Sequence, residues 1–387
     1  MKVYISYSLL VLLAILQMSV GETLSQEKNF DVAVPSALLM EPRTGTVIYQ
    51  KDQHKRLVPA SLVKIMTLLL TFEFVKEKNI SLDTVVKVSR EASLIGGRQI
   101  YLKERESITV EELIKSAAIF SANDAAYALA QMVAGTEDRF VAMMNDKAKE
   151  LGLTNTYFNN SHGLPGKSGE EQQYTTAYDL ALLARHVFFY YPEMFKYTTI
   201  KNDTIRNGAF ELVTTNNLMF KRDDVYGLKT GYIRASGFCV VNMARQGDFN
   251  LIAVVMGANS KQERFSIASR MLDYGFSTCG YKTITQLPNE IAIPVIDGIA
   301  ESVPVILATP ITIVIPKNKD IKLKFSYQTP VSLVAPVLSQ QWVGRVIISA
   351  GEHHSVSATL LTSGNVEQNN SILARLKRLF RRKNVSS

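Results

Sequence analysis

The sequence predicts an α/β protein in which an antiparallel sheet packs against a cluster of helices, followed by a second, smaller all-β domain. Two observations support this fold class. Between residues 37 and 272, strand patterns at the start and at the end enclose an uninterrupted block of helical patterns. After about residue 282, short β-branched runs alternate with prolines. A chain of 387 residues is long enough for two to three domains, each with its own core.

The first half of the first domain is predicted to be a β-hairpin followed by helices. Residues 37–50 have the pattern strand, turn, strand, with Pro42 and Gly45 in the turn. Pro59 precedes an apolar run over residues 65–75, which predicts a helix entered with proline in its first turn. Further helices are predicted on both sides of a short turn at residues 120–124, between 110 and 134, and then over residues 137–151 and 176–190.

The second half of this domain returns to strands. Residues 225–257 have a strand pattern, with runs 238–244 and 250–256 predicted as adjacent antiparallel strands. A final helix over residues 264–272 is expected to cover the sheet. The small β domain is predicted over residues 283–365, with strands over 291–295, 303–308, 311–315, 323–327 and 343–349. It contains no catalytic set of side chains, so we interpret it as a stalk or a partner-binding module.

The sequence Ser61-Leu62-Val63-Lys64 places a hydroxyl and an amine on the same face of a helix. A neutral amine in this position can take the hydroxyl proton, so Ser61 is a candidate nucleophile. Its place in the first helical turn, near the positive end of the helix dipole, favours negative charge on its oxygen. An isolated motif of this kind would be interpreted more simply as a serine that caps a core helix.

Two further motifs favour catalysis. Ser121-Ala122-Asn123 offers a hydroxyl and a carboxamide, although both residues are also typical of helix N-caps. Lys229-Thr230-Gly231 offers a cation and a hydroxyl for an anionic substrate, and its glycine lets a ligand approach the backbone closely. The motifs S-x-x-K, S-x-N and K-T-G in this order are the signature set of the penicillin-recognising serine enzymes.

Longer runs around these motifs resemble low-molecular-mass penicillin-binding proteins of the D-alanyl-D-alanine carboxypeptidase family. The runs are residues 57–67, 121–126, 160–164, 227–232 and 235–239. The resemblance extends over the mature chain, including the β-rich part and a basic tail. The chain departs from the family pattern at Val63 and Ile233, where members often carry threonine, and at Ala122, where members often carry glycine. These changes leave the reactive groups in place.

The resemblance implies a β-lactamase/transpeptidase-like fold for residues 26–280 and a serine-type D-Ala-D-Ala carboxypeptidase activity. Such an enzyme removes the terminal D-alanine from peptidoglycan pentapeptides through an acyl-enzyme intermediate and is inhibited by penicillin, so pentapeptide and β-lactams are the expected ligands. Ser61 is then the nucleophile and Lys64 the base, with a pKa lowered by burial and by Lys229. Ser121 relays a proton to the leaving amine.

The remaining site residues are expected to bind the substrate. The resemblance implies that the backbone N–H groups of Ser61 and Tyr232 stabilise the oxyanion and that Thr230 and Arg264 receive the terminal carboxylate. Asn123 is expected to hold the substrate amide. The complete expected substrate-binding set is Asn123, Lys229, Thr230, Gly231, Tyr232 and Arg264.

Three alternative functions use the same sequence features. A D,D-endopeptidase that cuts peptide cross-links has the same motifs. A β-lactamase shares the fold but needs fast deacylation, which class A enzymes commonly achieve with a glutamate in a dedicated loop, and we find no convincing counterpart between Lys149 and Tyr174. A non-catalytic wall-binding protein is disfavoured by the intact motifs.

No metal or other cofactor is expected, because the five histidines have no H-E-x-x-H spacing and the cysteines are not paired in the sequence. His162 is interpreted as a structural residue of its loop, with a contribution to the site as the alternative. Cys239 lies in an apolar strand pattern, where a cysteine is more often a small core residue than a bridge. We therefore expect Cys239 and Cys279 to be thiols rather than a disulfide.

Both ends of the chain suggest export and attachment to a membrane surface. Lys2, the apolar run over residues 9–15 and the small residues at 19–21 predict a signal peptide over residues 1–21. Residues 367–387 predict an amphipathic helix, with apolar residues at helical spacing among six basic residues, which would lie on an anionic bilayer; a disordered basic tail is the alternative. We expect a peripheral protein at the periplasmic face of the bacterial inner membrane.

The net charge of +8 does not indicate a nucleic-acid partner. Six of the excess positive charges fall in residues 371–387, which contain no acidic residue. The rest of the chain is nearly neutral and lacks the electrostatic footprint of a nucleic-acid binder.

Overall fold

The computed structural model describes residues 30–166, 171–317, 321–350 and 355–372. The described chain divides into two compact units after Thr278. The predicted fold class is confirmed: the first unit combines an antiparallel sheet with helices, and the second consists of strands. The predicted signal peptide and residues 373–387 of the predicted amphipathic helix lie outside the described residues.

The first unit is built on a five-stranded antiparallel sheet with the order β2-β1-β9-β8-β7. The predicted hairpin of β1 and β2 is confirmed, and β1 also pairs with β9, so the two ends of the unit share one sheet. The central strand β9 is almost completely buried, because helices cover both faces of the sheet. The strands are β1 (Ser36–Met40), β2 (Val47–Lys51), β7 (Val225–Ile233), β8 (Gly237–Gln246) and β9 (Phe249–Ala258).

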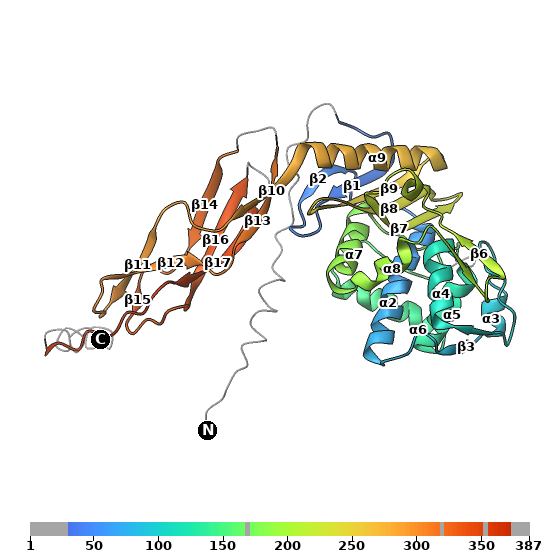
Figure 1. Cartoon of the computed structure of the whole chain (residues 1–387), viewed down its shortest axis with the longest axis horizontal. Helices are drawn as coiled ribbons and strands as arrows, with labels where there is room; N and C mark the ends of the chain where they lie inside the picture. The colour runs from blue at the N-terminus through green and yellow to red at the C-terminus, as the bar shows by residue number, and fades with distance from the viewer. Residues whose placement is uncertain (1–29, 167–170, 318–320, 351–354, 373–387) are drawn as a thin grey trace, which may run out of the picture. The chain divides into compact units, whose positions relative to one another are not determined.

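Helices form a layer on each side of this sheet (Figure 1). One face is covered by α9, Lys261–Thr278, which is longer than the predicted helix over 264–272. The other face carries the helical cluster, in which α7 packs on β9 and α2 packs on α5. The cluster comprises α2 (Lys64–Glu77), α3 (Arg90–Ser93), α4 (Val110–Lys115), α5 (Asn123–Ala134), α6 (Glu137–Glu150), α7 (Ala177–Tyr190) and α8 (Phe195–Thr198).

Local sequence explains where several of these helices begin. Thr109 and Glu112 form a reciprocal capping box at the start of α4, and Thr136 and Thr176 cap α6 and α7. The most buried helix, α2, has nine consecutive buried residues from Lys64 to Phe72.

Short segments complete the cluster. They are 3-10 turns at Ala60–Val63, Pro192–Met194 and Asn217–Phe220, a π turn at Ser116–Phe120, and the strand pairs β3 (Val85–Lys87) with β4 (Ser107–Thr109) and β5 (Asn202–Ile205) with β6 (Phe210–Val213).

The second unit contains a six-stranded sheet with the order β14-β16-β17-β12-β11-β15 and a separate antiparallel pair of β10 and β13. Its core includes Ile293, Ile313, Val346 and Leu360. Three of its strands, β10, β15 and β17, were not predicted. The strands are β10 (Cys279–Ile284), β11 (Ile291–Ile296), β12 (Ser302–Leu307), β13 (Ile311–Pro316), β14 (Leu323–Gln328), β15 (Leu333–Val334), β16 (Trp342–Ala350) and β17 (Ser355–Thr362).

The chain stays bonded to the second unit beyond residue 365. Val366 exchanges backbone hydrogen bonds with Val337, and the N–H of Asn369 donates to the carbonyl of Asp297. Residues 366–369 therefore pack with the β domain, and a segment available to a membrane begins later than the predicted start at residue 367. Among the described residues, no helix has the length and apolar character needed to cross a bilayer.

Both cysteines are buried, and neither forms a disulfide, as the sequence predicted. The Cys239 thiol on β8 accepts a hydrogen bond from the N–H of Gly257 and donates to the carbonyl of Ser236. Burial raises the pKa of the Cys239 thiol to about 11. Cys239 is thus a protonated core residue of the sheet.

Candidate active site

Ser61 and Lys64 lie together where the 3-10 turn Ala60–Val63 leads into α2. Lys64 Nζ lies 3.1 Å from Ser61 Oγ. The same amine donates to Oδ1 of Asn123 at 2.7 Å and to the backbone carbonyl of His162 at 2.6 Å. Ser61 is partly exposed, whereas Lys64 is completely buried. An amine in hydrogen-bonding distance of an accessible hydroxyl is the geometry that a serine nucleophile and its base require.

The environment of Lys64 favours its neutral form. Burial lowers the pKa of Lys64 to about 7; the negative charge of Asp124 opposes this shift, and the positive charge of Arg98 supports it. We expected Lys229 to lower the pKa of Lys64, but it is not among the causes of this shift. The repulsion between the two amines lowers the pKa of Lys229 instead. Burial and then the Lys64 charge lower the pKa of Lys229 well below its usual value.

Ser121 and Lys229 form a second pair of hydroxyl and amine. Lys229, on β7, donates from Nζ to Ser121 Oγ at 2.7 Å and to the carbonyl of Thr230 at 3.2 Å. Ser121 has the left-handed backbone conformation, with φ 67°, at the end of the π turn Ser116–Phe120. This conformation is uncommon for a residue with a side chain, and it presents the Ser121 hydroxyl to the β7 lysine.

Asn123 is the first residue of α5, and its side chain is used for contacts within the site rather than as an N-cap. Its Oδ1 accepts the hydrogen bond from Lys64, and its Nδ2 donates to the carbonyl of Gly96 at 2.9 Å. The carboxamide therefore links the buried lysine to the segment that precedes Arg98.

The end of β7 carries Thr230, Gly231 and Tyr232. Thr230 Oγ1 donates to Thr215 Oγ1 at 2.7 Å. A Cβ at Gly231 would lie 2.8 Å from the carbonyl oxygen of Pro59, so this glycine lets β7 approach the turn that carries Ser61. Tyr232 is 53% exposed, and its ring stacks on Phe238 with 4.1 Å between the ring centroids.

Arg264, on α9, is buried behind this strand end. Its Nη1 donates to the carbonyl oxygens of Gly231 at 3.1 Å and Cys239 at 3.2 Å. Among the described residues its Nε has no hydrogen-bond partner. Burial lowers the pKa of Arg264 to about 10, so it remains a cation at neutral pH and places positive charge behind the β7 backbone.

Two parts of the site were not predicted from the sequence. The first is the loop at residues 160–164, whose His162 carbonyl accepts from Lys64. Gly163 in this loop has φ +89°, and a Cβ there would clash with the Ala60 carbonyl oxygen. Burial lowers the pKa of the His162 ring to about 3, so the imidazole is neutral at neutral pH. The signals, a glycine directly after a histidine and an asparagine two residues before it, are too common to identify such a contact in advance.

The second unpredicted part is Asp124, which fastens the segment 96–102 to the start of α5. Its carboxylate accepts hydrogen bonds from the backbone N–H groups of Ile100 and Leu102. The N–H of Asn123 donates to the carbonyl of Arg98 at 2.7 Å. These bonds set the position of the Arg98 backbone beside the Ser121-Ala122-Asn123 turn.

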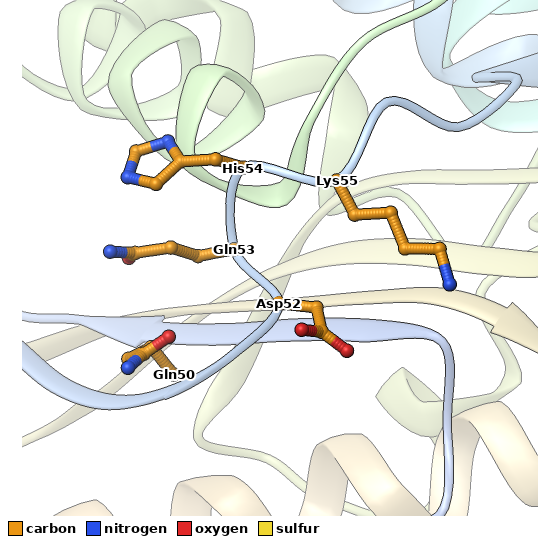
Figure 2. Close-up of a pocket in the computed structure, with 5 residues that line it drawn as sticks. All are labelled: Gln50, Asp52, Gln53, His54 and Lys55. Atoms are coloured by element: carbon orange, nitrogen blue, oxygen red, sulfur yellow. The ribbon is translucent and has the colours of Figure 1, made fainter.

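A hollow of about 630 Å³ lies elsewhere on the surface, after β2, and contains none of the predicted site residues. Figure 2 shows the side chains of His54 and Gln53 on one side of the chain and that of Lys55 on the other. It is lined by Gln50, Asp52, Gln53, His54 and Lys55, and most of these are exposed. The predicted residues Ser61, Lys64 and Lys229 lie instead where α2, α5 and β7 meet.

Comparisons with known proteins give a family match for each of the two units. Residues 22–260 match the family model described as D-alanyl-D-alanine carboxypeptidase, and residues 284–368 match the penicillin-binding protein 5, C-terminal domain. The D-alanyl-D-alanine carboxypeptidase DacF of Bacillus subtilis is 36% identical over 81% of this chain and 80% of its own. DacC of Escherichia coli is 32% identical over 86% of this chain and 84% of its own.

Solved structures give the same relationship. Penicillin-binding protein 5 from Haemophilus influenzae is similar with a TM-score of 0.77 and 26% identity, covering 89% of this chain and 100% of that one. DacD from Francisella tularensis is similar with a TM-score of 0.72 and 28% identity, covering 89% and 96%. With the matched family model spanning most of the first unit, the chain belongs to the D-alanyl-D-alanine carboxypeptidase family.

Proposed function

We propose that this protein is a serine-type D-Ala-D-Ala carboxypeptidase that removes the terminal D-alanine from peptidoglycan pentapeptides and is acylated by penicillin at Ser61. The observation that carries the proposal is the buried Lys64 amine, 3.1 Å from the Ser61 hydroxyl oxygen and with a pKa of about 7. A lysine with this pKa is neutral in a large fraction of molecules at neutral pH and can act as a base.

In the acylation step an ester bond to Ser61 forms and the peptide bond to the terminal D-alanine breaks. Neutral Lys64 takes the Ser61 proton as Oγ attacks the carbonyl carbon of the penultimate D-alanine. The C–N bond to the terminal D-alanine then breaks, and the leaving amine receives a proton through Ser121. Water subsequently hydrolyses the ester and regenerates Ser61. In this proposal the oxyanion is stabilised by the backbone N–H groups of Ser61 and Tyr232, and losing one such donor typically costs about 3 kcal/mol or more.

The substrate carboxylate is proposed to lie at the end of β7. Thr230 supplies a hydroxyl, Lys229 a neighbouring amine, and Arg264 positive charge behind the Gly231 carbonyl. Asn123 holds an amide of the acyl part of the peptide. The close approach of Gly231 to Pro59 supports this arrangement, because it brings the β7 strand end next to the Ser61 turn.

Mass spectrometry tests the activity. Incubation with a pentapeptide should release a single alanine, and incubation with penicillin should add one penicilloyl group to Ser61. Release of alanine only from cross-linked dimers would favour a D,D-endopeptidase, and rapid destruction of penicillin with recovery of unmodified protein would favour a β-lactamase. Absence of both reactions would favour a non-catalytic wall-binding protein.

We also propose that the protein is exported and attached to the periplasmic face of the bacterial inner membrane. The sequence of residues 1–21 and of the basic C-terminal segment supports this location. Two exposed apolar residues, Ile299 and Leu338, support it as well. Ile299 bonds to Glu367, and Leu338 follows the Val337 that pairs with Val366, so both lie where the chain leaves the β domain.

A further inference from the structure

The segment from Gly96 to Leu102 is held against the catalytic turn by hydrogen bonds from residues of α5. Asn123 binds it twice, through its backbone N–H to Arg98 and through its side chain to Gly96. Asp124 binds it at Ile100 and Leu102. The backbone at Arg98 is therefore fixed directly beside Asn123, although it belongs to a connecting segment.

The Arg98 side chain is exposed at this position. Its guanidinium carbon lies 4.8 Å from the centre of the Phe120 ring, and Phe120 immediately precedes Ser121. Within the described parts of the chain, the guanidinium has no hydrogen-bond partner and forms no ion pair. By contrast, Arg206 nearby is bonded to Glu106 and to the Ile100 carbonyl. Arg98 thus has all of its N–H donors available to a ligand.

Aromatic side chains form a continuous rim next to this arginine. Phe210 meets the Phe120 ring edge-on, with 5.6 Å between the centroids, and Tyr101 lies 6.5 Å from Phe210. Tyr101 is 67% exposed. The aromatic contact restrains the guanidinium, which reduces the entropy lost when a ligand binds it.

We propose that Arg98 is a specificity residue that binds a carboxylate on the acyl side of the peptide, in the residue that precedes D-Ala-D-Ala. This inference rests on the proposed function. In that function the terminal carboxylate lies at Thr230 and the scissile carbonyl at Ser61, so the acyl part extends past Asn123. Arg98 is fastened to Asn123, and the planar guanidinium can bind a carboxylate through two parallel hydrogen bonds.

The charge distribution agrees with an anionic ligand. Arg98 adds a positive charge beside Lys64 and Lys229, and this charge is one of the causes that lower the pKa of both lysines. A carboxylate bound at Arg98 would offset this excess of positive charge. A peptide with a neutral or cationic side chain in the same position would leave it uncompensated.

The experiment compares two peptides that differ in one group. Both end in D-Ala-D-Ala, and the residue before these carries either a free side-chain carboxylate or the corresponding carboxamide. D-Alanine release is measured as kcat/KM on the pH plateau above the Lys64 pKa, where the protonation of Lys64 no longer affects the rate. For the native protein we expect a preference of about fivefold for the carboxylate, as one exposed charge-assisted bond provides.

In Arg98→Gln the ratio between the two peptides should fall to about one, and in Arg98→Lys part of the preference should remain because the charge is kept. Arg270→Gln is the matched control: Arg270 also lies over an aromatic ring, that of Phe30 at 5.7 Å, but on α9 across the sheet. It should retain the native ratio.

Two results would overturn the inference while the proposed function stands. One is equal rates for both peptides with the native protein, and the other is a native ratio in Arg98→Gln, whether or not both rates fall by the same factor. If the native protein releases D-alanine from neither peptide, the proposed function itself fails.

Discussion

Lys229 donates a hydrogen bond to Ser121, with 2.7 Å between Nζ and Oγ. This bond joins strand β7 to the turn before α5, and it parallels the contact between Lys64 and Ser61. The site therefore contains two pairs of a buried amine and a hydroxyl. In the proposed mechanism one pair activates the nucleophile and the other delivers a proton to the leaving group.

Replacing the proposed nucleophile should abolish both reactions. In Ser61→Ala we expect no penicilloyl adduct and no release of D-alanine, because the Lys64 amine is left without a hydroxyl to deprotonate. Intact-protein mass spectrometry and an alanine assay measure the two effects. Ser93→Ala, which removes a surface hydroxyl that donates only to Arg90, is the control and should retain both. A stable adduct on Ser61→Ala would contradict the assignment.

The rate of acylation by penicillin should rise with pH through about 7 and then reach a plateau. The sign follows from the lowered pKa of Lys64: below about pH 7 the amine carries a proton and cannot act as a base, and above it the amine is neutral. Lys64→Arg, whose guanidinium stays protonated, should acylate extremely slowly at every pH. If the acylation rate of Lys64→Arg rises with pH as much as that of the native protein, another group is the base.

Gly163→Ala should lower both stability and activity. Its φ of +89° is unfavourable for alanine, and the added Cβ would meet the Ala60 carbonyl, next to Ser61. We expect a loss of about 1–3 kcal/mol in the free energy of unfolding, measured by denaturant titration, together with slower penicillin acylation. Gly152→Ala has a similar φ of +70° but open space around the Cβ. This variant should therefore lose stability but keep the native rate of penicillin acylation. Equal acylation rates in the two variants would contradict a role of this contact in the site.

Arg264→Ala should reduce D-alanine release more than penicillin acylation. The free terminal carboxylate of the peptide loses a nearby positive charge, whereas Lys229 and Thr230 remain to hold the antibiotic. The ratio of the two rate constants measures the effect. Because Arg264 also bonds the carbonyls of Gly231 and Cys239, equal losses with both ligands would show that it acts by holding the two strands.

Removing residues 373–387 should release the exported protein from the membrane fraction without changing its activity on a soluble pentapeptide. The cut spares residues 366–369, which are bonded to the β domain. The full-length protein should bind anionic vesicles less as salt rises, with some residual binding from apolar burial. Vesicle sedimentation compares the two forms, and undiminished pelleting of the truncated form would mean that attachment lies elsewhere.

Much of the fold and the central site could be predicted because their signals are local. The hairpin of β1 and β2 has a turn sequence, and the spacing of Ser61 and Lys64 places them on one helical face. Strand β10 was missed because it begins at Cys279, directly after α9 ends at Thr278, with no turn residues between them.

Contacts between distant segments could not be predicted in this way. The Lys64 amine bonds a carbonyl 98 residues later in the chain, and Arg98 reaches the site only because Asn123 and Asp124 bind its segment. Each of these contacts has a backbone N–H or C=O group as one partner, and almost every residue type carries both groups. Arg98 therefore has no motif around it that would distinguish it from an ordinary surface arginine.

Alkylation of the buried Cys239 can be used to measure how often the sheet of the first unit opens. A thiol with a pKa of about 11 inside the sheet is almost entirely protonated, and it is shielded from alkylating reagents while β8 remains paired. Alkylation at Cys239 must then wait for the sheet to open, so its rate measures how often the strand that pairs with the Lys229-Thr230-Gly231 segment separates from its neighbours. Comparing this rate with and without bound penicillin would show whether acylation at Ser61 slows the opening of a strand that makes no covalent bond to the antibiotic.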